Sequence, residues 1–251
     1  FEGGIDDVSL YAGALGSEEV FEMFDAGLRV MELKFDDPPG AETFEDSSGN
    51  GGTIMCFLEG YCPESGRPGR DNQAVSFGEQ PDDFFYEHTY LTTPLFDLAA
   101  KVLNRGGYTV MVWVKGRDFS EKAHIFGRTM TVNASGSPGF SSYHQEDEEP
   151  ISSVVLDTDV WYHLAWRWDD DAGERAIFVN GIEVANTTTA DRPRALFGPG
   201  RNYNGLLDNL VAINQALSDT EIQAVMNEAP VLALHLDEGL LEDDDPVSAA
   251  I

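Results

Sequence analysis

The two ends of this chain resemble each other, and this internal repeat restricts the possible folds more than any other feature. Residues 3–20 resemble residues 204–222, and residues 30–36 resemble residues 231–237. In both pairs the copies lie about 200 residues apart, whereas the units of solenoid proteins are about 20–50 residues long. The sequence therefore predicts tandem copies of a whole domain.

The repeat divides the chain into three parts. Residues 1–26 are expected to be the C-terminal strand and helix of a preceding repeat, residues 28–228 a complete domain, and residues 230–251 the opening strand of the next repeat. The flanking strands could pair with each other, complete a neighbouring subunit by strand addition, or belong to adjacent domains of a longer polypeptide. The residues expected at such a polymer junction are Asp6, Tyr11, Val30, Phe35, Val231 and Leu236.

The middle of the chain has the pattern of antiparallel strands. Residues 108–115 are a β-branched and aromatic run of strand length. Residues 160–168 alternate, so that one face of the strand carries Tyr162, Leu164, Trp166 and Trp168. The pair Asn180-Gly181 favours the positive φ angles of a tight hairpin turn.

Further short strands are predicted over residues 123–132, 140–144 and 151–156, and the acidic run 145–150 is predicted to be a solvated loop. The helical signal is small. Ser218-Asp-Thr-Glu221 has the pattern of a capping box, in which the Ser hydroxyl caps the helix and Glu221 reaches back to its start. A mostly antiparallel β-protein with one short helix near the end of each repeat is expected.

The charge of the chain excludes some classes of partner. Lys and Arg number 15 against 45 Asp and Glu, which gives a net charge of −30. A surface this negative repels nucleic acid and anionic lipid. The surplus suits either simple solubility or the binding of divalent cations. No apolar run reaches the roughly 18 residues of a membrane-spanning helix, so we expect no membrane insertion.

Two cysteines, Cys56 and Cys62, stand close together. Zinc needs about four ligands, and no second Cys or His pair has a matching spacing. The spacing favours a short disulfide loop, which implies an oxidising compartment; the alternative is a pair of reduced cytosolic thiols. We therefore expect an extracellular or cell-surface protein.

Three segments, in order along one repeat, carry a family resemblance. The loop from Phe44 through Asp46-Ser-Ser-Gly-Asn50-Gly, the hairpin Trp161-Tyr-His-Leu-Ala to Phe178-Val-Asn-Gly, and the run Gly205-Leu-Leu-Asp208-Asn-Leu to Ile222 resemble segments of laminin G-like, concanavalin A-like domains. The resemblance implies an all-β, two-sheet antiparallel jelly-roll sandwich. The cysteine region resembles the subset found in tandem arrays of large bacterial surface proteins.

The resemblance also implies a calcium ion, because many members of the family bind one. The matching positions are Asp46, Asn50 and Asp208, with Asp36 and Asp237 as further contributors. Calcium takes about 6–8 oxygen ligands from carboxylates, amides and carbonyls. The alternative is that Asp46 and Asn50 only cap a turn through hydrogen bonds to nearby backbone.

Other candidate sites are less specific. Asn133 and Asn186 each begin an N-glycan acceptor pattern. The tryptophans could stack on sugars, but core burial is expected for most of them. Loop tyrosines that could contact sugar are Tyr61, Tyr143 and Tyr203.

Catalysis has little support in the sequence. A glycosidase needs two carboxylates that flank the scissile bond, and no such pair stands out on an expected strand. The five histidines form no metal pair at helical spacing, and a Gly-x-Ser-x-Gly elbow is missing. We therefore expect the chain not to be an enzyme.

Two functions fit these observations. The first is a non-catalytic extracellular structural repeat, which builds a fibre, filament or surface stalk from tandem or strand-exchanged sandwich domains. Its partners would be copies of itself or neighbouring repeats. The alternative is a carbohydrate-binding, lectin-like adhesion module, whose partners would be glycans.

Overall fold

Eight strands form the larger of the two packed sheets in the computed structural model, which describes residues 29–49, 53–58, 61–78, 90–92, 107–127, 129–141, 148–189 and 198–227. Along this sheet lie β14 (Ile182–Thr188), β13 (Glu174–Val179), β12 (Tyr162–Asp169), β7 (Tyr108–Asp118), β16 (Asn204–Ile213), β5 (Gln73–Phe77) and β4 (Glu64–Pro68). The eighth strand, β1 (Arg29–Leu33), pairs with the C-terminal half of β16, whereas β5 pairs with its N-terminal half.

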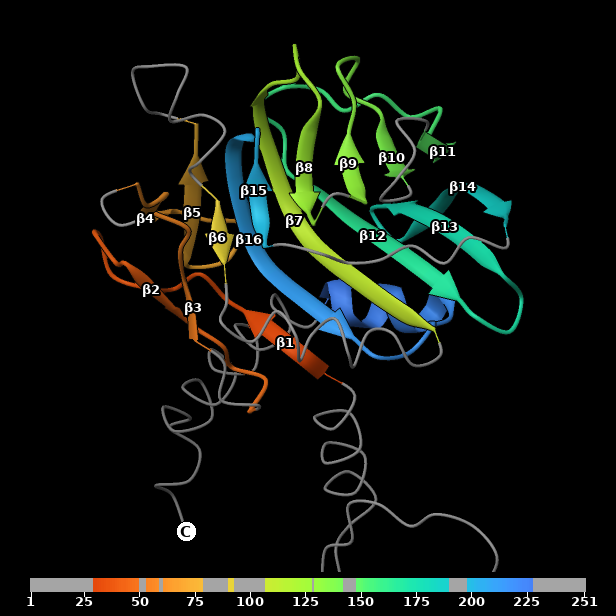
Figure 1. Cartoon of the computed structure of the whole chain (residues 1–251), viewed down its shortest axis with the longest axis horizontal. Helices are drawn as coiled ribbons and strands as arrows, with labels where there is room; N and C mark the ends of the chain where they lie inside the picture. Colours follow the sequence, from red (N-terminus) through yellow and green to blue (C-terminus); the bar gives the residue numbers. More distant parts are fainter. Residues whose placement is uncertain are drawn as a thin grey trace, which may run out of the picture.

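A smaller sheet packs over one face of the large sheet (Figure 1). It contains β11 (Glu148–Ile151), β10 (Pro138–Ser141), β9 (Met130–Val132), β8 (Ala123–Phe126) and β15 (Pro199–Arg201). A third sheet, of β2 (Thr43–Glu45), β3 (Thr53–Cys56) and β6 (Leu91–Thr92), lies at the β4–β5 end of the molecule. All described pairings are antiparallel, which confirms the expected all-β sandwich.

Strand alternation builds the main core between the two packed sheets. On β7 the even-numbered residues from Tyr108 to Val114 point into this core, as do Trp166 and Trp168 of β12. Trp166 also donates a hydrogen bond from Nε1 to the backbone oxygen of Gly139 on β10, at 3.0 Å. One fully buried side chain therefore joins the two sheets, because its ring packs on one and its N–H bonds the other.

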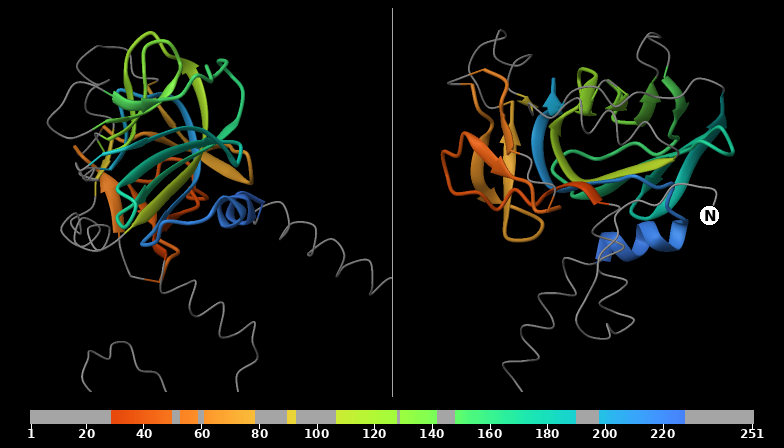
Figure 2. Two further views of the ribbon diagram at one scale, coloured as in Figure 1. Left: turned by 90° about the vertical axis from the view of Figure 1, so that its right-hand side faces the viewer. Right: turned by 60° about the horizontal axis from the view of Figure 1, so that its bottom comes forward.

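A second apolar cluster covers the opposite face of the large sheet. The helix over residues 219–227 lies there, as the right-hand view of Figure 2 shows. Its Ile222 packs, with Leu217 just before the helix, on odd-numbered residues of the sheet such as Met111 and Val211. Ser218 and Glu221 bond each other reciprocally at the helix start, which confirms the capping box.

Several expected elements are confirmed and others are corrected. Asn180 and Gly181 have φ angles of 51° and 74°, as a tight hairpin turn requires. The segment 123–132 is two strands, because the chain turns at Gly127. Residues 148–150 belong to β11 rather than to a loop, and residues 152–156 are not a strand. In that segment Ser152 Oγ accepts a hydrogen bond from the N–H of Val154, a local contact that competes with strand pairing.

Candidate functional site

Asp208 is a buried carboxylate at an irregularity in β16. The register of β16 against β7 shifts between Asp208 and Val211, and Asn209 between them has a φ of 46°. The side chain of Asp208 is fully buried. Its Oδ2 accepts hydrogen bonds from the N–H groups of Arg70 (2.7 Å) and Asp71 (3.0 Å). The turn between β4 and β5 therefore wraps over this carboxylate.

Close approach of the backbone to Asp208 requires a glycine in that turn. A Cβ on Gly69 would lie 2.6 Å from Asp208 Oδ2 and 2.4 Å from the backbone oxygen of Gln73. Both distances are shorter than real Cβ contacts. The motif Gly69-Arg70-Asp71 thus serves to present two N–H groups to a carboxylate far away in the sequence.

The surroundings of Asp208 disfavour the charged form of its carboxylate. Burial raises the pKa of Asp208 to about 7, the two N–H bonds oppose the rise, and the nearby charges of Asp36 and Asp71 add to it. Its second oxygen, Oδ1, is buried and has no hydrogen-bond partner among the residues that the structure describes. A buried acceptor without a hydrogen-bond partner lowers the stability of the fold. A bound cation or a proton on Oδ1 would remove this cost.

Asp36 reaches this region through a strained backbone. Its Oδ1 accepts a hydrogen bond from the N–H of Gln73, at 3.0 Å. The preceding Phe35 is buried and has a φ of 58°, a left-handed conformation that is rare for a bulky residue. Asp36 and Asp71 therefore belong to the same group of carboxylates as Asp208.

Asp46, another predicted calcium ligand, bonds backbone groups that differ from those of Asp208. Asp46 Oδ1 accepts hydrogen bonds from the N–H groups of Glu32 (2.9 Å) and Ser48 (3.0 Å), so Asp46 caps its own turn. Asn50 lies outside the described residues. Asp46 and Asp208 thus bond two separate backbone segments. Within the described ranges, no three His, Cys, Asp or Glu side chains are arranged closely enough to hold a metal ion.

A tryptophan and a histidine cover the sheet next to Asp208. Trp113 is the β7 partner of both Asp208 and His163 in the sheet register. The guanidinium of Arg70 lies 4.8 Å from the Trp113 ring centroid, and the His163 ring meets Trp113 edge-on at 5.3 Å. Burial lowers the pKa of His163 to about 4. The imidazole is therefore neutral in the folded protein at neutral pH.

His163 should make stability depend on acidity. Its pKa rises from about 4 when folded to 6.5 when unfolded, so the unfolded chain binds more protons between these values and stability falls as pH falls through this window. At pH 5 the loss is about 2 kcal/mol relative to pH 7. Denaturant unfolding of the wild type and His163→Gln at both pH values measures it. Equal pH dependence of the two proteins would contradict a buried neutral His163.

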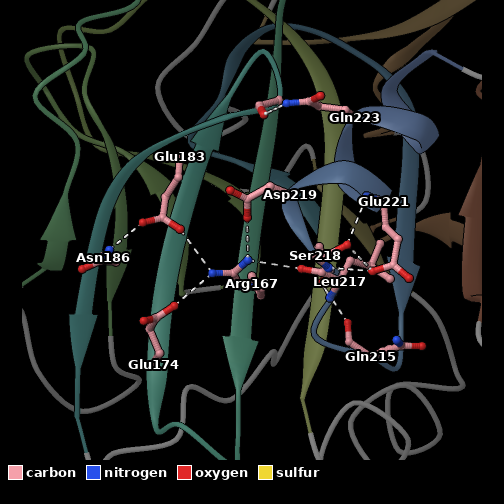
Figure 3. Close-up of polar contacts among 12 residues, drawn as sticks. Arg167, Glu174, Glu183, Asn186, Gln215, Leu217, Ser218, Asp219, Glu221 and Gln223 are labelled. Atoms are coloured by element: carbon pink, nitrogen blue, oxygen red, sulfur yellow. Dashed lines mark hydrogen bonds and ion pairs between the residues drawn. The ribbon is translucent and has the colours of Figure 1, made fainter.

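Arg167 forms a cluster of charges on the outer face of β12 (Figure 3). Its guanidinium bonds Glu174 of β13 (2.9 Å), Glu183 of β14 (3.2 Å) and Asp219 of the helix (3.1 Å). It also donates to the backbone oxygen of Leu217 at 3.2 Å, and it lies over the ring of Phe178. The Arg167 side chain is only 13% exposed. The ion pairs of Arg167 therefore link the start of the helix to the β13–β14 hairpin.

Replacing Arg167 should loosen the helix. Arg167→Ala leaves Glu174 and Glu183 without their shared cation, and we expect a loss of about 2 kcal/mol, discounted from the value for a fully buried pair because the acids are partly exposed. Arg167→Lys should recover less than half, because an ammonium cannot reproduce the planar fork. Glu64→Ala, which removes an exposed pair with Arg67, should cost less than about 0.5 kcal/mol. Thermal melts compare all three variants, and equal losses in Arg167→Ala and Glu64→Ala would refute the cluster's role.

The disulfide between Cys56 and Cys62 is present, as the spacing predicted. It closes a loop at the end of β3 that contains Tyr61, a half-buried side chain. The other two candidate sugar contacts do not join it: Tyr203 is buried against Phe77, and Tyr143 lies outside the described residues. Sequence reasoning missed Phe57, which is 42% exposed and stacks on Tyr90 next to this disulfide.

The two predicted glycan acceptors differ in their surroundings. Asn133 Oδ1 accepts bonds from the N–H and Oγ of Ser135 and from the N–H of Ser137, so it holds a turn. Asn186 is exposed on β14 and its Nδ2 donates to Glu183. Modification at either position stays a prediction.

The predicted polymer junction lies mostly outside the described residues. Val30 and Phe35 belong to or follow β1, where Val30 is half-buried and Phe35 is in the core. Asp6, Tyr11, Val231 and Leu236 are outside the described ranges. The same holds for the whole of segments 1–26 and 230–251, so the division into repeats stays a prediction.

The sequence of this chain matches one protein family. A laminin G-type family model, described as the concanavalin A-like lectin/glucanases superfamily, matches residues 88–223. No curated protein matches the sequence. No helix in the described part of the chain is long and apolar enough to cross a membrane.

Solved structures with a similar fold include several binding domains. A structure of botulinum neurotoxin type C, a toxin whose cell entry depends upon interaction with two ganglioside molecules, has a TM-score of 0.61 at 10% identity over 83% of this chain and 53% of its own. The binding domain of botulinum neurotoxin DC, in complex with rat synaptotagmin II, has a TM-score of 0.58 at 12% identity over 82% of this chain and 52% of its own. The chain thus spans about half the length of these toxin structures.

A third structure is matched over nearly its whole length. It is domain 4 of the arabinanase AbnA from Geobacillus stearothermophilus, in complex with arabinotriose. The TM-score is 0.51 at 17% identity, and the match covers 78% of this chain and 97% of that domain. At these identities the likeness shows a shared fold.

Proposed function

We propose that this chain, which belongs to the concanavalin A-like lectin/glucanases superfamily, is a non-catalytic extracellular module that binds glycans. The observation that carries the proposal is the match to the arabinanase domain. That domain is matched over 97% of its own length, and it holds arabinotriose. The similar structure of botulinum neurotoxin type C, a toxin whose cell entry depends upon interaction with two ganglioside molecules, supports the same function.

A location outside the cell and a lack of catalysis are parts of the proposal. The Cys56–Cys62 disulfide supports an oxidising compartment. Asp208, the described carboxylate whose pKa is raised to about 7, is fully buried beneath a turn, where it could not reach a glycosidic bond. A glycosidase would need two carboxylates on opposite sides of its substrate.

A glycan array probed with the full chain tests the function. We expect saturable binding to a subset of glycans, and unchanged glycans after long incubation when reducing ends are assayed. Binding to none of the glycans would contradict the proposal. Release of reducing ends would show that the chain is an enzyme instead.

A structural role in a tandem array is a second proposal, and the internal repeat supports it. Residues 204–222 contain β16 and the start of the helix of this sandwich, and residues 3–20 have a similar sequence. We propose that adjacent repeats, or copies of the chain, join end to end and display the binding module on a fibre or stalk. Electron microscopy of the native polymer would show filaments with a repeat of one sandwich.

Calcium binding is also a proposal, and Asp208 is the residue that best fits it. The unpartnered and buried Oδ1 of Asp208, next to the carboxylates of Asp36 and Asp71, has the oxygen chemistry that calcium prefers. Asp208 would be the central ligand. Because no three acidic side chains of the described residues lie close enough to hold an ion, backbone oxygens or water would have to supply the other ligands, and Asp46 already accepts two backbone N–H bonds. When bound, calcium would neutralise the buried charge of Asp208 and fix the β4–β5 turn on β16.

A further inference from the structure

Phe57 is an exposed aromatic ring that the fold holds in a fixed orientation. Among the described residues five large apolar side chains are exposed, and Phe57 is the one aromatic among them. Its ring lies nearly parallel to that of Tyr90, with centroids 4.4 Å apart and an angle of 18° between the planes. Tyr90 is itself only 8% exposed. Part of the Phe57 ring is therefore exposed at the surface beside a buried ring that it stacks on.

Strand alternation explains why Phe57 faces outward. Ile54 and Leu91 of the third sheet are in the main core, and Cys56 pairs with Leu91. Phe57 and Tyr90 are the next residues beyond this pair, so they point away from that core. The N–H of Phe57 donates to the backbone oxygen of Tyr90 at 3.0 Å, which continues the pairing of the two strands.

Two links restrain the backbone that carries Phe57. The strand before it is paired on both sides, with β2 and with β6. The disulfide from Cys56 to Cys62 then closes the loop that begins with Phe57, and the N–H of Tyr61 bonds the oxygen of Leu58 inside that loop. A ring restrained in this way loses little conformational freedom when it binds a ligand.

The charge of the chain narrows the choice of ligand. A net charge of −30 raises the energy of any anionic ligand near the surface. The Phe57–Tyr90 stack offers an apolar aromatic face, which suits the flat C–H face of a sugar ring. We propose that the Phe57–Tyr90 stack is the sugar-binding platform of this module and that it takes uncharged glycans in preference to sialylated or sulfated ones. This assignment rests on the proposed glycan-binding function.

Substitution at Phe57 tests the platform. The probes are uncharged oligosaccharides (arabinotriose, xylotriose, cellotriose and lactose), each titrated into the full chain by calorimetry. For a glycan that binds the wild type, we expect Phe57→Ala to weaken the affinity about tenfold or more, as loss of a buried aromatic contact does at binding hot spots. Phe57→Trp should stay within about threefold, because it keeps a flat ring.

A matched control separates the platform from exposed apolar surface in general. Ile182→Ala removes a side chain that is 65% exposed on β14, at the opposite edge of the large sheet, and should leave affinity unchanged. Sialyllactose should bind more weakly than lactose, and more so at low salt. Melting temperatures check that each variant is folded.

The possible results distinguish the platform from the function. If the wild type binds a glycan and Phe57→Ala binds it within twofold, the platform is wrong while the function stands. If the wild type binds none of these probes and no glycan on the array, both are wrong. Tighter binding of sialyllactose than of lactose would overturn the preference for uncharged glycans.

Discussion

Trp166→Ala should destabilise this protein more strongly than the loss of Arg167 or of any exposed side chain. The ring is fully buried in the main core and its Nε1–H bonds the oxygen of Gly139 on the opposite sheet. Removing it leaves a cavity between the sheets, and a buried Trp→Ala change costs about 3–5 kcal/mol. For a domain of this size the melting temperature should fall on the order of 10 °C. Thermal melts followed by circular dichroism measure the shift.

Two controls define what this loss means. Trp166→Phe keeps most of the ring volume and loses only the N–H; Gly139 still accepts a bond from Thr131 Oγ1, so a loss of about 1 kcal/mol is expected. Trp161→Ala removes a half-buried ring just before β12 and should cost less than half as much as Trp166→Ala. Similar losses in all three variants would mean that Trp166 does not lie between two packed sheets.

Calcium should stabilise the wild type strongly and leave Asp208→Asn unchanged. An ion that binds only the folded state adds about 3 kcal/mol when its concentration is about 100-fold above its Kd. The melting temperature of the wild type should therefore rise on the order of 10 °C on titration with calcium, and EDTA should reverse the rise. Differential scanning calorimetry of both proteins, with and without calcium, gives the two shifts.

The melting temperatures of the wild type and Asp208→Asn can also be compared in EDTA, where no calcium is bound. Without an ion, Asp208 is a buried carboxylate whose pKa is raised to about 7 by burial and by neighbouring acids. Asn keeps an acceptor for the N–H groups of Arg70 and Asp71 and carries no charge, so Asp208→Asn should melt at or above the wild type at pH 7. A lower melting temperature for Asp208→Asn in EDTA would contradict this view of the carboxylate.

A substitution of Asp46 separates the two candidate ligand sets. Asp46→Asn should lower stability with and without calcium, because Asp46 holds the N–H groups of Glu32 and Ser48. The calcium shift itself should persist. If Asp46→Asn abolishes the shift and Asp208→Asn does not, the ion lies in the Ser-Gly-Asn-Gly loop, as the family resemblance alone suggests. If calcium changes the melting temperature of neither variant and leaves that of the wild type unchanged, the chain has no such site.

Local patterns in the sequence predicted the elements that local interactions determine. The alternation in residues 160–168 predicted which face of β12 lines the main core, because a strand's side chains alternate regardless of context. The Asn180-Gly181 turn and the Ser218–Glu221 capping box each involve residues within a few positions of one another. The disulfide followed from two nearby cysteines. The family resemblance added the sandwich architecture.

The sites depend on contacts that the sequence does not display. Asp208 meets the N–H of Arg70 across 138 positions, and Arg167 gathers three acids from two strands and a helix. Phe57 stacks on Tyr90 because β3 pairs with β6, and no periodic pattern marks either residue. The family resemblance selected Asp46 and Asp208 together, but position along a motif does not reveal which backbone groups a carboxylate bonds.

The central claim is that this sandwich recognises an uncharged glycan at a defined surface. Amide chemical-shift mapping of the full chain, titrated with the uncharged oligosaccharide that the array ranks first, tests it most directly. We predict saturable shifts that centre on residues 55–58, 61–62 and 90–92, the described part of the third sheet and its disulfide loop. Saturable shifts centred elsewhere on the folded protein, or none at millimolar glycan, would contradict it.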